Sequence, residues 1–255
     1  MVKGFSAIFY GSPGVGKTTL AMEFPKPIDC FSCHETGLED LIDIGEVDPK
    51  YCRNINVKDY GTLLPSLNRS DARTVVIDAL NGLQRLLFDY CIQNDYGGSF
   101  DEFMDYWKGP RQIAPRYATA LCSTLEELRH KGTNVIILSH ETTNLVHNPK
   151  GLDYTESTLD IDDGIRTIFT KWASNIIYMT LDPGIEQVTK KVKGTATEAK
   201  VKSDDVRVFF TQASLVHAAK NKVKLPSVIR MGSNSEEAYD NLVSQLPEVY
   251  KEILM

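Results

Sequence analysis

Apolar residues recur along this chain in short continuous runs, separated by stretches in which they are spaced three and four apart. Runs of this length and composition are typical of buried β-strands, and they occupy residues 5–10, 27–32, 73–78, 134–140 and 175–181. The helical spacing between them is clearest at Leu83, Leu86 and Leu87 and again over Ala118 to His130. Strands that alternate with helices predict an α/β fold with a mostly parallel central sheet and right-handed crossovers.

The pattern changes after residue 183. Residues 186–211 alternate well enough for a β-hairpin, with breaks at Gly194-Thr195 and Asp204-Asp205. Residues 235–254 have the spacing of a helical tail interrupted at Pro247. We find no internal repeat or low-complexity linker. We therefore expect one domain over 1–255, with a parallel core (1–183), an appended basic β-rich extension (184–231) and a helical tail (232–255).

The first strand runs directly into a loop that fits the pattern G-x-x-x-x-G-K-[ST], made of Gly11, Ser12, Pro13, Gly14, Val15, Gly16, Lys17, Thr18 and Thr19. Glycines let the backbone curl so that successive N–H groups point at phosphate oxygens. A lysine at this position reaches the β- and γ-phosphates, and the following hydroxyl can bind Mg²⁺. The stretch predicts a nucleotide site that uses ATP and Mg²⁺, followed by a helix that Pro25 ends.

Two carboxylates follow strands that should end at the same edge of the sheet. Asp78 ends a run of four apolar residues, where it can hold a magnesium-bound water beside Thr18. Glu35 follows the second strand and is the candidate base that deprotonates an attacking water. An apolar strand ending in aspartate is common, and a glutamate in a turn before a helix is often only a surface residue.

Three further residues are candidates for catalysis. His140 ends the fourth strand, where a polar side chain would face the γ-phosphate and report it to the next loop; alternatively, it is a satisfied strand-end residue. Lys220 and Lys222 lie two apart on an extended segment, so their side chains should share one side. They could contact the γ-phosphate of a neighbouring subunit, or belong to a solvated basic turn.

Charge is distributed unevenly along the chain. The net charge is −6, yet residues 186–230 carry ten Lys/Arg against four acids, which gives that segment +6 and the remainder −12. A basic segment on an otherwise acidic chain indicates a local anionic contact. By contrast, the polar segment 141–170 is acidic in its middle. A group of aromatic residues in this part of the chain could stack nucleic-acid bases. We favour the alternative, in which they pack against the body of the protein or a neighbouring molecule. They are Tyr96, Phe100, Phe103, Tyr106 and Trp107.

Five cysteines and the absence of targeting signals bear on location. No run of about twenty apolar residues predicts a membrane helix, and the chain enters its first strand without a signal peptide. The odd cysteine count then indicates reduced thiols in a cytoplasm. Cys30, Cys33, His34 and Cys52 suggest zinc, but no second close pair accompanies them, so we favour free thiols.

In this order, the phosphate loop, Glu35, Asp78, His140 and the Lys220/Lys222 pair resemble the RecA/recombinase superfamily of ATPases, in particular small phage-encoded versions associated with single-strand annealing. The resemblance covers about residues 5–229. It implies ATP hydrolysis to ADP, and assigns Lys17 and Thr18 to nucleotide and Mg²⁺, Asp78 to the metal and Glu35 to catalysis. His140 stands where the family often has a glutamine, and Lys220 and Lys222 match a trans-acting lysine pair.

The resemblance further implies a phage protein of the host cytoplasm that acts as a homo-oligomer on single-stranded DNA, with 141–170 as a DNA-binding loop and a single-strand-binding protein as a possible partner. The expected activity is DNA-stimulated ATP hydrolysis in recombination or annealing. Two other functions remain open from the sequence. One is a nucleotide-gated loader or adaptor with slow turnover, and the other is a small-substrate nucleotide kinase, which would need an arginine-rich lid.

Overall fold

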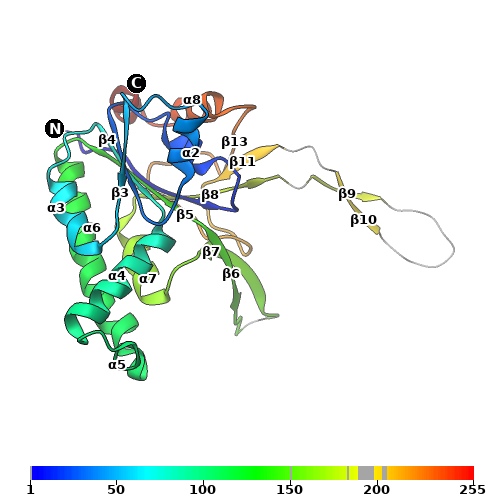
Figure 1. Ribbon diagram of the computed structural model, residues 1–255. Helices are drawn as coiled ribbons and strands as arrows, with labels where there is room; N and C mark the ends of the chain where they lie inside the picture. The colour runs from blue at the N-terminus through cyan, green and yellow to red at the C-terminus, as the bar shows by residue number, and fades with distance from the viewer. Residues whose placement is uncertain (1, 150, 183, 189–197, 203–205) are drawn as a thin grey trace.

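The computed structural model describes residues 2–149, 151–182, 184–188, 198–202 and 206–255, and in these residues a nine-stranded β-sheet forms the middle of the molecule (Figure 1). Six of its strands are parallel, in the spatial order β8 (Asn175–Leu181), β1 (Ser6–Gly11), β5 (Asn134–Ser139), β4 (Thr74–Asp78), β2 (Ile28–Ser32) and β3 (Cys52–Asn56). Three antiparallel strands extend it beyond β8: β11 (Arg207–Phe210), β12 (Lys220–Asn221) and β13 (Val228–Arg230).

Helices cover both faces of this sheet. Because successive strand residues point to opposite faces, Ile8 and Tyr10 of β1 enter one apolar cluster while Ala7 and Phe9 enter the other. The first cluster is covered by α3 (Tyr60–Asn68), α4 (Leu80–Asp95), α6 (Ala114–His130) and α7 (Asp163–Trp172). The second is covered by α1 (Lys17–Ala21), α2 (Gly37–Asp43), α8 (Ser235–Ser244) and α9 (Glu248–Leu254). The expected α/β fold is confirmed.

The predicted parallel strands match the structure closely. Every residue of β1, β4 and β5 is buried, which explains why their sequences are continuous apolar runs and not alternating ones. The helical tail is also confirmed, with α8 and α9 separated at Pro247. The helix after the phosphate loop is shorter than expected, because α1 ends at Ala21 and its chain continues in turns to Pro25.

Two regions differ from the expectation. The polar segment 141–170 is not a loop: it forms a hairpin of β6 (Glu141–Val146) and β7 (Tyr154–Leu159), followed by the first turns of α7. In the basic region, β9 (Gly184–Val188) and β10 (Glu198–Lys202) form the expected hairpin. However, β11 leaves it and joins the main sheet, because Val208 and Phe209 are buried there beside β8. The expected breaks at 194–195 and 204–205 lie outside the described residues.

The strand order determines where the predicted site residues meet. Asp78 ends β4, Glu35 follows β2, and the phosphate loop follows β1, so all three lie at the carboxyl edge of the sheet. β5 lies between β1 and β4, so the residue that follows it, His140, is placed between the phosphate loop and the two carboxylates. In the described residues, no helix is long and apolar enough to cross a membrane.

Position 82 in α4 requires glycine, because the helix passes very close there to the loop that carries Glu35. A Cβ atom built at Gly82 would lie 1.7 Å from the carbonyl oxygen of Cys33. An ordinary Gly→Ala change inside a helix stabilises by roughly 0.5–1 kcal/mol. Here we expect Gly82→Ala to lower the free energy of unfolding by about 1–3 kcal/mol, because the helix and loop must separate.

Urea unfolding followed by circular dichroism tests this, with Arg85→Ala at an exposed site of the same helix as the control. A Gly82→Ala protein as stable as the wild type or more stable would contradict the contact.

Candidate functional site

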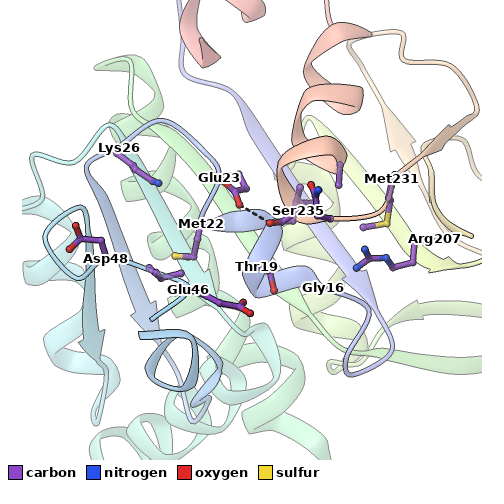
Figure 2. Close-up of a pocket in the computed structure, with 14 residues that line it drawn as sticks. Gly16, Thr19, Met22, Glu23, Lys26, Glu46, Asp48, Arg207, Met231 and Ser235 are labelled. Carbon is purple, nitrogen blue, oxygen red and sulfur yellow. Dashed lines mark hydrogen bonds between the residues drawn. The ribbon is translucent and has the colours of Figure 1, made fainter. Parts of the chain in front are cut away.

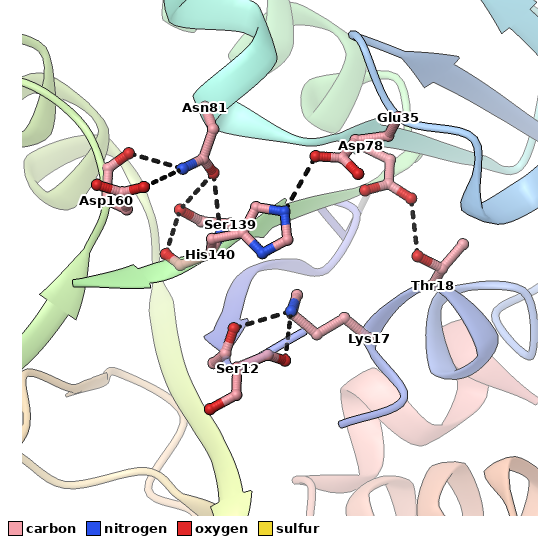
Figure 3. A network of polar contacts seen from close by, with 10 residues as sticks. Ser12, Lys17, Thr18, Glu35, Asp78, Asn81, Ser139, His140 and Asp160 are labelled. Carbon is pink, nitrogen blue, oxygen red and sulfur yellow. Dashed lines mark hydrogen bonds and ion pairs between the residues drawn. The ribbon is translucent and has the colours of Figure 1, made fainter. Parts of the chain in front are cut away.

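The phosphate loop leaves β1 and enters α1 with the backbone that its sequence requires. Gly14 and Gly16 have φ values of 79° and 98°, in the left-handed region that other residues rarely adopt. Lys17 is buried, and its Nζ donates to the carbonyl oxygens of Gly11 at 2.8 Å and Ser12 at 2.9 Å. The loop therefore holds its ammonium group pointing inward (Figure 3).

Burial and charge act in opposite directions on Lys17. Burial lowers the pKa of its ammonium, and the carboxylates of Asp78, Glu35 and Glu141 partly offset this. Glu141 also accepts a short hydrogen bond from the Ser12 hydroxyl, which links the start of β6 to the loop. A single cation thus faces three acidic side chains, an arrangement suited to an anionic ligand that arrives with a metal ion.

Thr18 and Asp78 lie together, as the sequence predicted. The Thr18 hydroxyl donates to Asp78 Oδ2 at 2.9 Å, and Asp78 is only 4% exposed. Burial, followed by the charge of Glu35, raises the pKa of Asp78 to about 6, although the Thr18 hydrogen bond and Lys17 oppose the shift. A hydroxyl and a carboxylate at this distance are a pair of hard oxygen donors, the type of ligand that Mg²⁺ prefers.

Glu35 and His140 contact each other directly, which the sequence did not predict. The Glu35 Oε1 and His140 Nε2 atoms lie 3.0 Å apart, and each side chain is 30% exposed. The other ring nitrogen of His140, Nδ1, is buried and has no hydrogen-bond partner among the described residues. His140 therefore holds the candidate base directly through one nitrogen (Figure 3).

Asn81, in the first turn of α4, connects His140 to the end of β7. Its Oδ1 accepts from the His140 backbone N–H at 2.9 Å, and its Nδ2 donates to Asp160 Oδ2 at 2.8 Å. The Asp160 N–H in turn donates to the His140 carbonyl oxygen at 3.0 Å. Asn81 was not predicted from the sequence, where its only signal was its place as a polar residue three positions after Asp78.

Two clefts lie on either side of the loop. One has a volume of about 360 Å³ and is lined by residues that include Lys17, Thr18, Glu35, Asp78 and His140. The other, of about 420 Å³, lies between α1, the 46–48 turn and the start of α8 (Figure 2). Arg207 points into this second cleft, with Nη1 3.1 Å from where a Gly16 Cβ would lie. Arg207 could not be predicted as a site residue from the sequence, because only the tertiary fold brings β11 beside the loop.

The two candidate lysines lie away from the phosphate loop of their own chain. Lys220 Nζ donates to the carbonyl oxygens of Thr170 at 2.6 Å and Lys171 at 3.0 Å, which stabilises the C-terminal end of α7. Lys222 follows β12 and is exposed. Neither lysine lines the cleft that contains Thr18 and Asp78.

The cysteines are buried and unpaired. Burial raises the pKa of Cys33 to about 12 and also raises the pKa of Cys30. Cys52 is buried as well, on the neighbouring strand β3. Among the described residues, no three His, Cys, Asp or Glu side chains are grouped so that they could hold a metal ion.

Comparisons with known proteins show the family to which the chain belongs. Among solved structures, the chain is similar to the flagellar accessory protein FlaH of Methanocaldococcus jannaschii, with 10% identity and a TM-score of 0.47 over 90% of this chain and 85% of FlaH. No curated protein matches its sequence. A family model described as an AAA domain matches residues 3–221. The chain therefore belongs to the AAA-domain family.

Proposed function

We propose that this protein binds ATP with Mg²⁺ and hydrolyses it to ADP and phosphate. The observation that carries the proposal is the convergence of three groups at one edge of the sheet: the Lys17 ammonium, the Thr18–Asp78 oxygen pair and the Glu35–His140 pair. A binding module would need only the first two. The third supplies a proton acceptor beside the place where the terminal phosphate would lie.

The residues present fit a magnesium ion. Thr18 and Asp78 would hold it, because both offer oxygen atoms and they already lie within hydrogen-bonding distance of each other. When bound, Mg²⁺ neutralises charge on the phosphate oxygens. Lys17 binds the β- and γ-phosphates from inside the loop, and can exchange its bonds to the Gly11 and Ser12 carbonyl oxygens for phosphate oxygens.

Glu35 would orient the attacking water and accept its proton. The His140 ring fixes the position of this carboxylate, because the 3.0 Å contact joins Nε2 directly to Oε1. The proton leaves the water as its oxygen bonds to the γ-phosphorus, and the bond to the β-phosphate oxygen breaks. Asn81 holds the His140 backbone, so the base is supported by two layers of contacts.

The cleft in Figure 2 is our candidate for the nucleoside. It opens beside Gly16 and Thr19, on the side of the loop away from Asp78. Arg207 can contact the α-phosphate or the base from there, and Nη2 is held by the Ser233 carbonyl oxygen at 3.0 Å. Ser235 and Glu23, which bond to each other at 2.6 Å, offer polar groups to a ribose.

A role on single-stranded DNA, as a homo-oligomer in phage-type recombination or annealing, is the finer part of the proposal. It is supported by the resemblance of the site residues to recombinases and by the basic segment 186–230. Lys222 is exposed and lies away from its own chain's cleft, as a residue that completes a neighbour's site would be. Of the basic residues, Lys190, Lys191 and Lys193 lie outside the described residues.

The first test is Glu35→Gln. We expect ATP hydrolysis to fall by about 10²- to 10⁴-fold, because the amide cannot accept the proton, while nucleotide affinity is retained. Lys17→Ala should instead abolish nucleotide binding. Phosphate release and the fluorescence of a bound nucleotide analogue separate the two effects, and Glu39→Gln, an exposed carboxylate of α2, is the matched control.

Undiminished turnover in Glu35→Gln would remove the catalytic assignment. The site would then match a nucleotide-gated loader or adaptor, in which ATP binding and not its hydrolysis controls the partner.

The second test is the pH dependence of Mg²⁺ binding. The pKa of Asp78 is raised to about 6, so the carboxyl is protonated below that pH and must lose the proton to hold the metal. We expect Mg²⁺ affinity of the nucleotide complex to be constant above pH 7 and to fall about tenfold per pH unit below 6. Calorimetric titration of Mg²⁺ between pH 5 and 8 measures it.

Phosphate oxygens titrate in the same range, with a pKa of about 6 for a terminal group. Titration of Mg²⁺ into free ATP in the same buffers therefore serves as the control. A pH profile identical to that of free ATP would show that Asp78 does not hold the metal.

A further inference from the structure

Two exposed aromatic side chains lie in the segment between α5 (Phe100–Met104) and the π-helical turn η2 (Gly109–Ile113). Figure 1 shows α5 at the lower end of the molecule. Tyr106 is 85% exposed and Trp107 is 50% exposed. Rings of this size are normally covered, so two adjacent exposed ones mark a contact surface. We call these rings, with Lys108 and Arg111, the aromatic platform.

The backbone conformation of the aromatic platform keeps both rings exposed to solvent. Tyr106 and Trp107 have φ values of 48° and 57°, in the left-handed region that costs energy for residues other than glycine. The segment is anchored below by Phe103, which is fully buried. Gly109 allows this, since a Cβ there would lie 2.2 Å from the Phe103 ring. Buried packing therefore maintains a strained display of exposed rings.

Each ring of the aromatic platform makes a cation–π contact with a basic side chain. Lys108 Nζ lies 5.5 Å from the centre of the Tyr106 ring, and the Arg111 guanidinium carbon lies 5.7 Å from that of Trp107. Asp105 pairs with Lys108 at 3.6 Å, so part of this charge is offset. Exposed aromatic faces with cations beside them match the chemistry of single-stranded nucleic acid, in which bases stack and phosphates need neutralising.

The aromatic platform is also connected to the ATP site. η2 packs against α7, where a Cβ at Gly164 would lie 3.2 Å from the Pro110 carbonyl oxygen. The residue that caps α7, Asp162, donates its N–H to Gln84 Oε1 at 2.5 Å. Two residues earlier, Asp160 bonds to Asn81, which holds His140. Packed contacts thus run continuously from the platform to the residue that positions Glu35.

We propose that the aromatic platform is a binding site for single-stranded DNA, with bases stacked on Tyr106 and Trp107 and the backbone phosphates beside Lys108 and Arg111. The proposal rests on the single-stranded DNA role put forward above and places its contact near the N-terminal end of α7, whereas Lys220 contacts the C-terminal end. Because only two cations take part and one is paired with Asp105, stacking supplies most of the affinity. Binding should then depend only weakly on salt.

Tryptophan fluorescence provides a direct measurement. The chain has two tryptophans, so Trp172→Phe leaves Trp107 as the sole reporter in the full-length protein. We expect oligo(dT) to quench its emission, with a slope of log affinity against log salt no steeper than about −1.4, the value for two phosphates. Tyr106→Ala, measured in that background, and Trp107→Ala, measured by oligo(dT) anisotropy, should each weaken binding by about 5- to 150-fold.

The chain supplies a matched control. Tyr51 is 44% exposed with Lys50 5.1 Å from its ring centre, but it stands alone before β3. Tyr51→Ala should leave oligo(dT) affinity unchanged. Trp107→Phe keeps a ring for stacking and should restore most of the affinity lost in Trp107→Ala, which separates stacking from any loss of folding.

The outcomes distinguish this proposal from the proposed function. Wild-type binding to oligo(dT) that survives both alanine substitutions would overturn the platform and keep the DNA role. ATP hydrolysis without detectable oligo(dT) binding would overturn the DNA role and the platform together, and leave the ATPase assignment. A steep salt slope that Trp107→Ala does not change would place the DNA elsewhere on the chain and also overturn the platform.

Discussion

Burial of the central strands on both faces is the constraint on which the site depends. β1, β4 and β5 are completely buried, so a polar side chain can reach the ligand only where one of these strands ends. Parallel pairing brings those ends to the same edge. Since β5 lies between β1 and β4, His140 lies between the phosphate loop and the carboxylates. The same burial gives Asp78 its raised pKa, so the packing that positions the site also tunes its chemistry.

Short sequence motifs were enough to predict those parts of the site that lie within one continuous segment of the chain. The phosphate loop has its residue types at fixed spacing, and Asp78 follows an apolar run whose length defines a strand. Glu35 and His140 could be assigned to the same edge, because each follows a strand. Their contact could not be predicted, since it depends on which strands are neighbours in space, and strand order is not encoded in any one segment.

The segments that sequence analysis interpreted incorrectly lack a one-sided apolar pattern. Most residues of β6 and β7 are polar and at least partly exposed, so the alternation along these strands carries little hydrophobic signal and 141–170 resembled a loop. β11 belongs to the main sheet because Phe209 packs among the buried residues of the second core, a contact made with segments far away in the chain. The aromatic residues grouped together in the sequence also differ in the fold, because Phe103 is buried whereas Tyr106 is exposed.

The charges around Lys17 determine how the site can work. The Lys17 ammonium lies near three carboxylates, those of Asp78, Glu35 and Glu141, and burial lowers its pKa. The loop alone is therefore not a strongly positive site for an anion. Under the proposed function, a triphosphate would add further negative charge, which a divalent cation beside Thr18 and Asp78 would offset. The triphosphate would also compete with Glu141 for the Ser12 hydroxyl at the start of β6. Under the proposed function, the phosphates would repel Glu141 at the start of the β6–β7 hairpin, and His140, immediately before that hairpin, contacts Glu35.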